Sequence, residues 1–238
     1  MRRFYLALVG TLAVLIMSAL PIRVAALGEV QANLACSDGT ISDLVVDTDT
    51  LTGLKDAVEA MTLYPAGLTC TLSSTPLTTS LGANVAQASG GTDFVVGGGQ
   101  RTFCNTNIAI NGHAQTGMTT PAWGTVNQTI PDGAPGGCQG IFRTEVVCVV
   151  IKSPTDAFVG ARITTSTGVF SDALYTEGKY LVWYFHEGNS ADIFNPPIMW
   201  NSAPLDNDPS TSAATCTFAP ITTTDTLVHG RILVKQHA

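Results

Sequence analysis

The chain has 238 residues, and its 11 basic against 18 acidic residues give a formal net charge of −7. This balance excludes a typical nucleic-acid or anionic-lipid binder, because an acidic surface repels both and no Lys/Arg cluster offsets it locally. Charged residues form only 12% of the chain, about half the usual share in a globular domain. Thr, Ser, Gly and Asn supply the polarity instead. Because these residues favour turns and strands, the composition predicts a mainly β protein.

The first 26 residues predict an export signal. Arg2 and Arg3 precede an apolar run over residues 4–20, and the small residues at 24–26 suit a signal peptidase. The alternative is a retained membrane anchor, since the apolar run is just short of a bilayer span. Removal of residues 1–26 takes three arginines away and leaves 8 basic and 18 acidic residues, a net charge of −10. We therefore expect a secreted or extracellular protein, which would be periplasmic in a source with an outer membrane.

Six cysteines follow the predicted signal, and they allow 15 pairings. An even number in an oxidising compartment normally pairs off, which argues against a catalytic thiol. No C-x-x-C or Cys/His cluster has zinc spacing, so we expect no metal site. Each disulfide should contribute about 2–4 kcal/mol of stability. Proximity along the chain and the expected strands favour the pairs Cys36–Cys70, Cys104–Cys138 and Cys148–Cys216.

Residues 27–80 predict a small α/β unit. A short strand over 41–46 leads into the capping residues 47–50, and a second strand is expected over 68–72. Between them a helix is expected, because apolar residues recur at helical spacing. These residues are Leu51, Leu54, Val58 and Met61. With Cys36 and Cys70 paired, this unit would be a disulfide-closed strand-helix-strand motif.

Residues 81–92 predict a linker or loop, and residues 93–238 an antiparallel β domain. Gly97-Gly98-Gly99 is expected at a tight turn or bulge between strands, because the Lys-Ser/Thr pair and helix of a phosphate-binding loop are missing. Short strands with Gly/Pro punctuation favour an antiparallel β-sandwich or barrel. The expected strands cover residues 94–96, 101–114, 122–130, 142–151, 157–165, 180–186 and 227–234.

Several runs in this region resemble uncharacterised secreted bacterial β-domain proteins. The runs are FVVGGG at 94–99, EVVC at 145–148, AFVGARI at 157–163 and LVHGRILV at 227–234. The segment 47–70 is also similar to part of some secreted hypothetical proteins. The resemblance implies secretion and a β fold, and it carries over no activity or catalytic residues.

The sequence offers no catalytic constellation, and we expect no catalytic residue, metal or cofactor. No G-x-S-x-G turn for a nucleophilic serine occurs. His186 and Glu187 look reactive, but adjacent strand residues point to opposite faces, so Glu187 does not orient His186. Residues 206–208 offer oxygen ligands yet lack the Gly and distal Glu of an EF-hand, which favours a solvated loop. His113 is expected in a Gly-flanked turn.

Four residues are candidates for ligand binding. Trp200 is expected in an irregular loop and Trp123 near a strand start, while Tyr184 and His186 lie on the strand 180–186. Exposed aromatic side chains suit stacking on sugars or on a peptide. The alternative is that they plug the end of the β body. The strand 180–186 is apolar on both faces, which predicts a central, buried position.

The sequence therefore favours a secreted, disulfide-stabilised, non-catalytic module with a binding or structural role at the cell surface or outside the cell. Its partner would be a surface polymer or a protein, with no nucleic acid and, after signal cleavage, no membrane. The alternative is a small β-barrel enzyme or ligand carrier with a cavity near His186.

Overall fold

The structure is a computed structural model that describes residues 29–76, 91–171, 175–187, 198–201, 216–217 and 225–237. The predicted signal over 1–26, the acidic segment 206–208 and nearly all of the predicted linker 81–92 lie outside these ranges.

The N-terminal unit contains a three-stranded antiparallel sheet and one helix. Its elements are β1 (Val30–Cys36), β2 (Ile41–Val46), α1 (Thr48–Leu63) and β3 (Cys70–Pro76). The sheet order is β2-β1-β3, so β1 is the central strand. The sequence reasoning missed β1. Ala32 and Leu34 are buried at alternate positions, but the neighbouring Gln31 and Asn33 make this strand only weakly apolar.

The helix α1 lies between the two strands where the sequence predicted it, and it begins directly after the predicted capping residue Asp47. The carboxylate of Asp47 accepts a hydrogen bond from the backbone N–H of Thr50 at 2.6 Å, which satisfies one of the free donors of the first turn. Tyr64 follows the last helical residue. The predicted apolar face is buried at Leu51, Leu54 and Met61.

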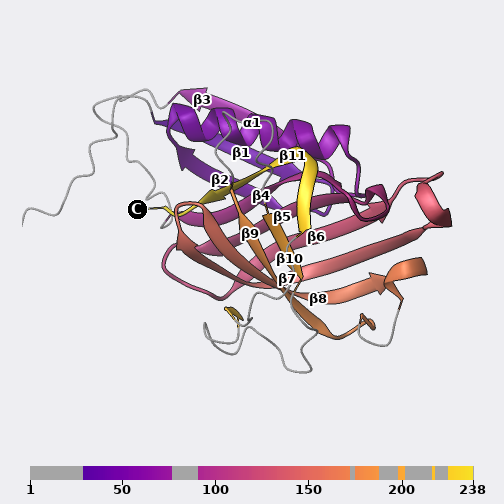
Figure 1. The fold of residues 1–238 in the computed structure, drawn as a ribbon. Coiled ribbons are helices and arrows are strands. Elements are labelled where there is room, and N and C mark those ends of the chain that lie inside the picture. Colours follow the sequence, from indigo (N-terminus) through magenta and orange to yellow (C-terminus); the bar gives the residue numbers. More distant parts are fainter. Residues whose placement is uncertain are drawn as a thin grey trace, which may run out of the picture.

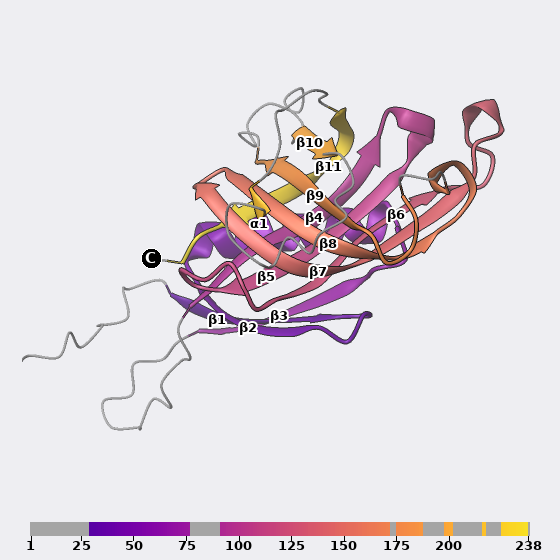
Figure 2. The same cartoon turned by 90° about the horizontal axis from the view of Figure 1, so that it is seen from below.

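The remaining strands form a closed antiparallel barrel. They are β4 (Thr92–Arg101), β5 (Asn107–Gln115), β6 (Ala122–Ile130), β7 (Gly140–Ser153), β8 (Asp156–Ser166), β9 (Tyr180–His186), β10 (Ile198–Asn201) and β11 (Asp225–Lys235). The strand order is β10-β11-β4-β5-β6-β7-β8-β9, so sequence neighbours pair and the short β10 joins β9 to β11. Figures 1 and 2 show the barrel with α1 and the three-stranded sheet on one side. The predicted mainly β fold is confirmed, and of the two predicted forms, sandwich or barrel, the strands adopt the barrel.

Three glycines expected at a turn lie inside β4 instead. A Cβ on Gly97 would sit 2.1 Å from the backbone oxygen of Arg231, and one on Gly99 would sit 2.1 Å from that of His229. A Cβ on Gly98 would meet Met61 of α1. The turn prediction was wrong because these glycines allow β11 and α1 to approach β4 closely.

Side chains fill the interior of the barrel. Leu181, Trp183 and Phe185 of β9 point into the core, where Trp183 lies edge-on to Phe142 with ring centroids 6.2 Å apart. An eight-stranded barrel is just wide enough for such side chains to fill it. The predicted buried character of residues 180–186 is confirmed for this inner face.

The N-terminal unit packs on the outer surface of β11, β4 and β5. Leu34 and Leu54 share a core with Phe94 and Leu233 of the barrel strands. At the edge of this core, Arg231 Nη1 lies 2.9 Å from Asp56 Oδ2 of α1.

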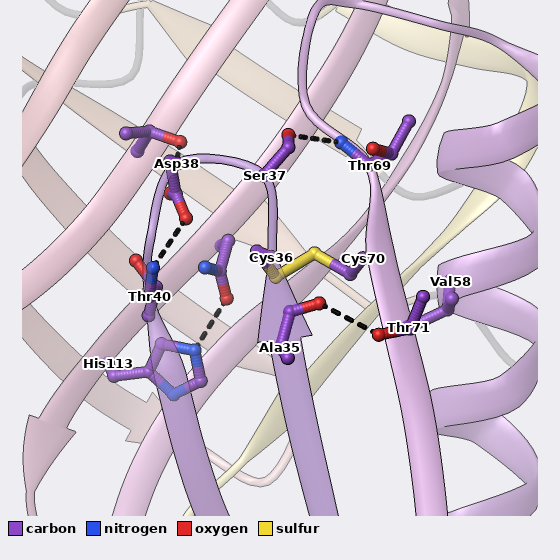
Figure 3. The surroundings of a disulfide bond; sticks show 12 residues. Ala35, Cys36, Ser37, Asp38, Thr40, Val58, Thr69, Cys70, Thr71 and His113 are labelled. Carbon is purple, nitrogen blue, oxygen red and sulfur yellow. Dashed lines mark hydrogen bonds between the residues drawn. A yellow bond between two sulfur atoms is a disulfide. The ribbon is translucent and has the colours of Figure 1, made fainter.

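Three disulfides cross-link the chain, and they are the pairs favoured from the sequence: Cys36–Cys70, Cys104–Cys138 and Cys148–Cys216. The first joins opposing residues of β1 and β3 (Figure 3). None of the three connects the N-terminal unit to the barrel. Among the described residues, no helix has the length and apolar character needed to span a bilayer.

Candidate functional site

A cluster of polar side chains surrounds Asp156, the first residue of β8. Asp156 lies directly opposite His186 of β9, and its Oδ1 is 2.7 Å from His186 Nδ1. The hydroxyl of Tyr184, two residues earlier on β9, donates to the same oxygen. Since alternate residues of β9 fill the core, Tyr184 and His186 lie on the outer face.

The turn between β7 and β8 supplies further donors. The hydroxyls of Ser153 and Thr155 both donate to Asp156 Oδ2, the second at 3.2 Å. The backbone N–H of Thr155 donates to Ser153 Oγ at 3.2 Å. Four side chains thus converge on one carboxylate. We call Ser153, Thr155, Asp156, Tyr184 and His186 the Asp156 cluster.

These contacts fix the charge state of the cluster. Burial by itself would raise the pKa of Asp156, but the hydrogen bonds from Ser153, Tyr184 and His186 outweigh it and lower that pKa to about 2. Burial and the bond to Asp156 raise the pKa of Tyr184 to about 12. At neutral pH the carboxylate is therefore ionised and the phenol protonated.

A groove of about 700 Å³ adjoins the cluster. It lies between the first turn of α1, the β7–β8 turn and the C-terminal end of β11, and Thr155 belongs to both groove and cluster. Its volume is within the range of small-ligand sites. The groove is lined by Asp49, Thr50, Pro154, Thr155, Glu187, Arg231, Leu233, Val234, Lys235, Gln236 and His237.

Glu187 is the partly buried acid of this groove. Its Oε2 accepts the backbone N–H of Val234 at 2.8 Å, and its Oε1 lies 3.8 Å from Arg231 Nη2. Burial raises the pKa of Glu187, although these neighbours oppose the rise. Glu187 therefore fastens the end of β9 to β11, which is a structural role.

The hydrogen bonds of Ser153 differ from those of the serine in a catalytic triad. In a catalytic triad the histidine accepts the serine proton and the carboxylate orients the histidine. Here Ser153 donates to Asp156 and not to His186, so no activated serine results. Within the part of the chain that the structure describes, no three His, Cys, Asp or Glu residues are placed to hold a metal ion.

The structure brings only some of the predicted binding residues together. Tyr184 and His186 share the Asp156 cluster. Trp123 lies elsewhere, on β6, where it is half-buried and stacks on His113 with ring centroids 5.8 Å apart. Trp200 was expected in a loop, but it belongs to β10 and is paired with Tyr184 in the strand register. The Trp200 side chain lies outside the described part.

Sequence reasoning missed Asp156 as the partner of His186. The carboxylate considered from the sequence was that of the adjacent residue, Glu187. The actual partner is 30 residues away in sequence and adjacent across the sheet. The sequence did contain one signal for this pair. Asp156 precedes one expected strand and His186 ends the next, and antiparallel pairing of two consecutive strands places the start of the first beside the end of the second.

The chain was also compared with known proteins, and no family model, curated protein or solved structure matches it. The resemblance to secreted bacterial β-domain proteins therefore stays a prediction.

Proposed function

We propose that this chain is secreted and acts as a disulfide-stabilised, non-catalytic binding module, with its ligand held against the Asp156 cluster and in the adjacent groove. Three disulfides suit an oxidising location outside the cytoplasm, and the predicted signal over residues 1–26 agrees with such a destination.

The convergence of four side chains on the Asp156 carboxylate carries this proposal. A side chain held by several hydrogen bonds loses little further entropy when a ligand binds, so the cluster is preorganised. His186 uses Nδ1 toward Asp156 and has 36% of its side chain exposed, which leaves Nε2 for a ligand. Since the barrel interior is filled, a ligand is expected on this outer surface.

The groove favours a polar ligand. Carboxylates at Asp49 and Glu187 face cations at Arg231 and Lys235, so neither sign of charge dominates. Hydroxyls such as that of Thr155 add hydrogen-bonding capacity. These groups match the hydroxyls of a surface polymer or the main-chain amides of a protein segment.

A binding experiment with matched variants tests the proposal. Wild type, His186→Ala and the control His229→Ala would be applied to glycan arrays, purified cell-wall polymer and arrays of extracellular proteins. His229 stacks on Tyr64 away from the cluster, with ring centroids 5.9 Å apart. We expect His186→Ala to weaken retention at least tenfold, equivalent to about 1.4 kcal/mol, and His229→Ala to retain it. Equal retention by all three proteins would refute the site.

The Asp156–His186 pair also supports a second candidate, a small enzyme or ligand carrier that uses the groove. A carboxylate that orients an imidazole is the arrangement of a general base. This candidate predicts turnover of an ester, glycoside or peptide panel by wild type and loss of turnover in His186→Asn. Such turnover would replace the proposal of a non-catalytic module.

A further inference from the structure

A histidine is buried where the N-terminal unit meets the barrel. His113 was expected in a turn, but it lies on β5 with no exposed surface. Its ring stacks on Trp123, and its centroid is 6.1 Å from that of Phe94. Figure 3 shows His113 beside the β1–β2 turn, which carries Asp38; the Cys36–Cys70 disulfide joins the adjoining ends of β1 and β3.

The single hydrogen bond of His113 fixes which ring nitrogen carries the proton. Nε2 lies 2.5 Å from Asn111 Oδ1, and because an amide oxygen only accepts, Nε2 carries the proton. Nδ1 is buried and has no hydrogen-bond partner among the described residues. Protonation of Nδ1 would place a charged donor in this contact without an acceptor.

Among the described residues, Asp38 is the charged group that acts on the imidazole. Burial disfavours the protonated ring more strongly than Asp38 favours it, so the pKa of His113 falls to about 4. Asp38 itself accepts from Thr125 Oγ1 of β6 at 3.0 Å. The neighbours on β4, β5 and β6, namely Phe94, Asn111 and Trp123, do not titrate.

The contact between the N-terminal unit and the barrel has a polar side and an apolar side. Near the β1–β2 turn, β5 and β6, the buried polar atoms Ser42 Oγ, Asn111 Nδ2 and Asn127 Oδ1 have no partner among the described residues. Toward α1, β4 and β11 the contact is apolar, and Leu44 and Val46, farther from the turn on β2, belong to this apolar side. Water that entered the polar side would satisfy these groups, so this side opens more easily.

We propose that His113 is an acid-sensitive contact that holds the β1–β2 side of the N-terminal unit on β5 and β6 while it is neutral, and that its protonation loosens this side of the unit. The apolar α1 side stays in place. The absence of a disulfide between unit and barrel makes the opening possible without a covalent step.

The pH range of the effect follows from proton linkage. Between pH 6.5 and about 4 the opened form binds a proton that the closed form excludes. Across this range the opening equilibrium should rise by up to about tenfold for each unit of pH decrease. Above pH 6.5 it should be independent of pH, because the imidazole is then neutral in both forms.

Hydrogen exchange of the full chain at pH 4–7 measures this opening. After correction for intrinsic exchange, amides of β1, β2, β5 and β6 should lose protection as the pH falls, while amides of β8 and β9 keep theirs. His113→Gln, which cannot be protonated, should show no such loss. His229→Gln serves as the control and should respond like wild type.

Two results would overturn the proposal. One is the same acid response in His113→Gln as in wild type, and the other is simultaneous loss of protection in β8 and β9. If His113→Gln does not fold, ¹⁵N NMR of the wild-type imidazole decides the matter. A His113 ring that is neutral at pH 5 supports the proposal, and a ring that titrates near pH 6.5 refutes it.

Discussion

The molecule holds two histidines in opposite surroundings. His113 is fully buried between aromatic rings and has one satisfied nitrogen. His186 is partly exposed and faces a carboxylate that three further hydroxyls keep ionised. The first site is polar but incompletely paired, whereas in the second the carboxylate accepts from four side chains. Acid should therefore disturb the contact around His113 well before it disturbs the Asp156 cluster.

The largest expected effect comes from Trp123→Ala. Loss of the ring that stacks on His113 leaves a cavity and admits water, so the free energy of unfolding should fall by about 2–3 kcal/mol. Urea denaturation at pH 7 measures this. A change in the free energy of unfolding below about 0.5 kcal/mol, together with weaker ligand retention, would instead support the binding role that the sequence predicted for Trp123.

Asp156→Asn should have the next largest effect, a loss of about 1–2 kcal/mol at pH 7, because hydrogen bonds to a charged acceptor are lost. The depressed pKa means that this stability is present above the ordinary value of 3.8 and disappears as the pH falls through about 2. Urea midpoints of variant and wild type should therefore converge at low pH. In the variant, ultraviolet titration should find the pKa of Tyr184 below its present value of about 12.

Glu187→Gln should have a smaller effect. The raised pKa of Glu187 means that its protonated form suits the fold better than its ionised form. Its contribution is complete below the ordinary value of 4.5 and is lost as the pH rises through the folded-state pKa. Gln resembles the protonated form, so the variant should gain stability relative to wild type between pH 4.5 and 7, by less than about 1 kcal/mol. Urea midpoints at both pH values test the sign.

His186→Gln should have the smallest effect on stability, within about 0.5 kcal/mol, because a partly exposed polar pair contributes little. Thermal unfolding at pH 7 measures this, with His113→Gln as the comparison. A loss for His186→Gln as large as that for His113→Gln would show that exposure does not separate the two sites.

The sequence predicted the elements that local patterns specify. The bounds of β6 and β9 and the Asp47 cap of α1 agree with expectation, because alternation and capping are local signals. The strand β10 and the position of Gly97-Gly98-Gly99 were missed, since both depend on contacts with other strands.

The candidate site was predictable only in part. Tyr184 and His186 stood out through their residue types, but Asp156 became their partner through the register of β8 and β9. His113 is buried because the N-terminal unit, which is distant in sequence, packs on the outer face of the barrel. A single sequence does not reveal which strand faces will be covered in this way.

The placement of the disulfides has one more consequence. Because no disulfide connects the part before Pro76 to the part after Thr92, a single proteolytic cut between these residues would yield two polypeptides held together by non-covalent contacts. Each polypeptide would keep its own disulfides. The N-terminal fragment could then dissociate, and a synthetic copy of it supplied in trans could bind the barrel fragment in its place.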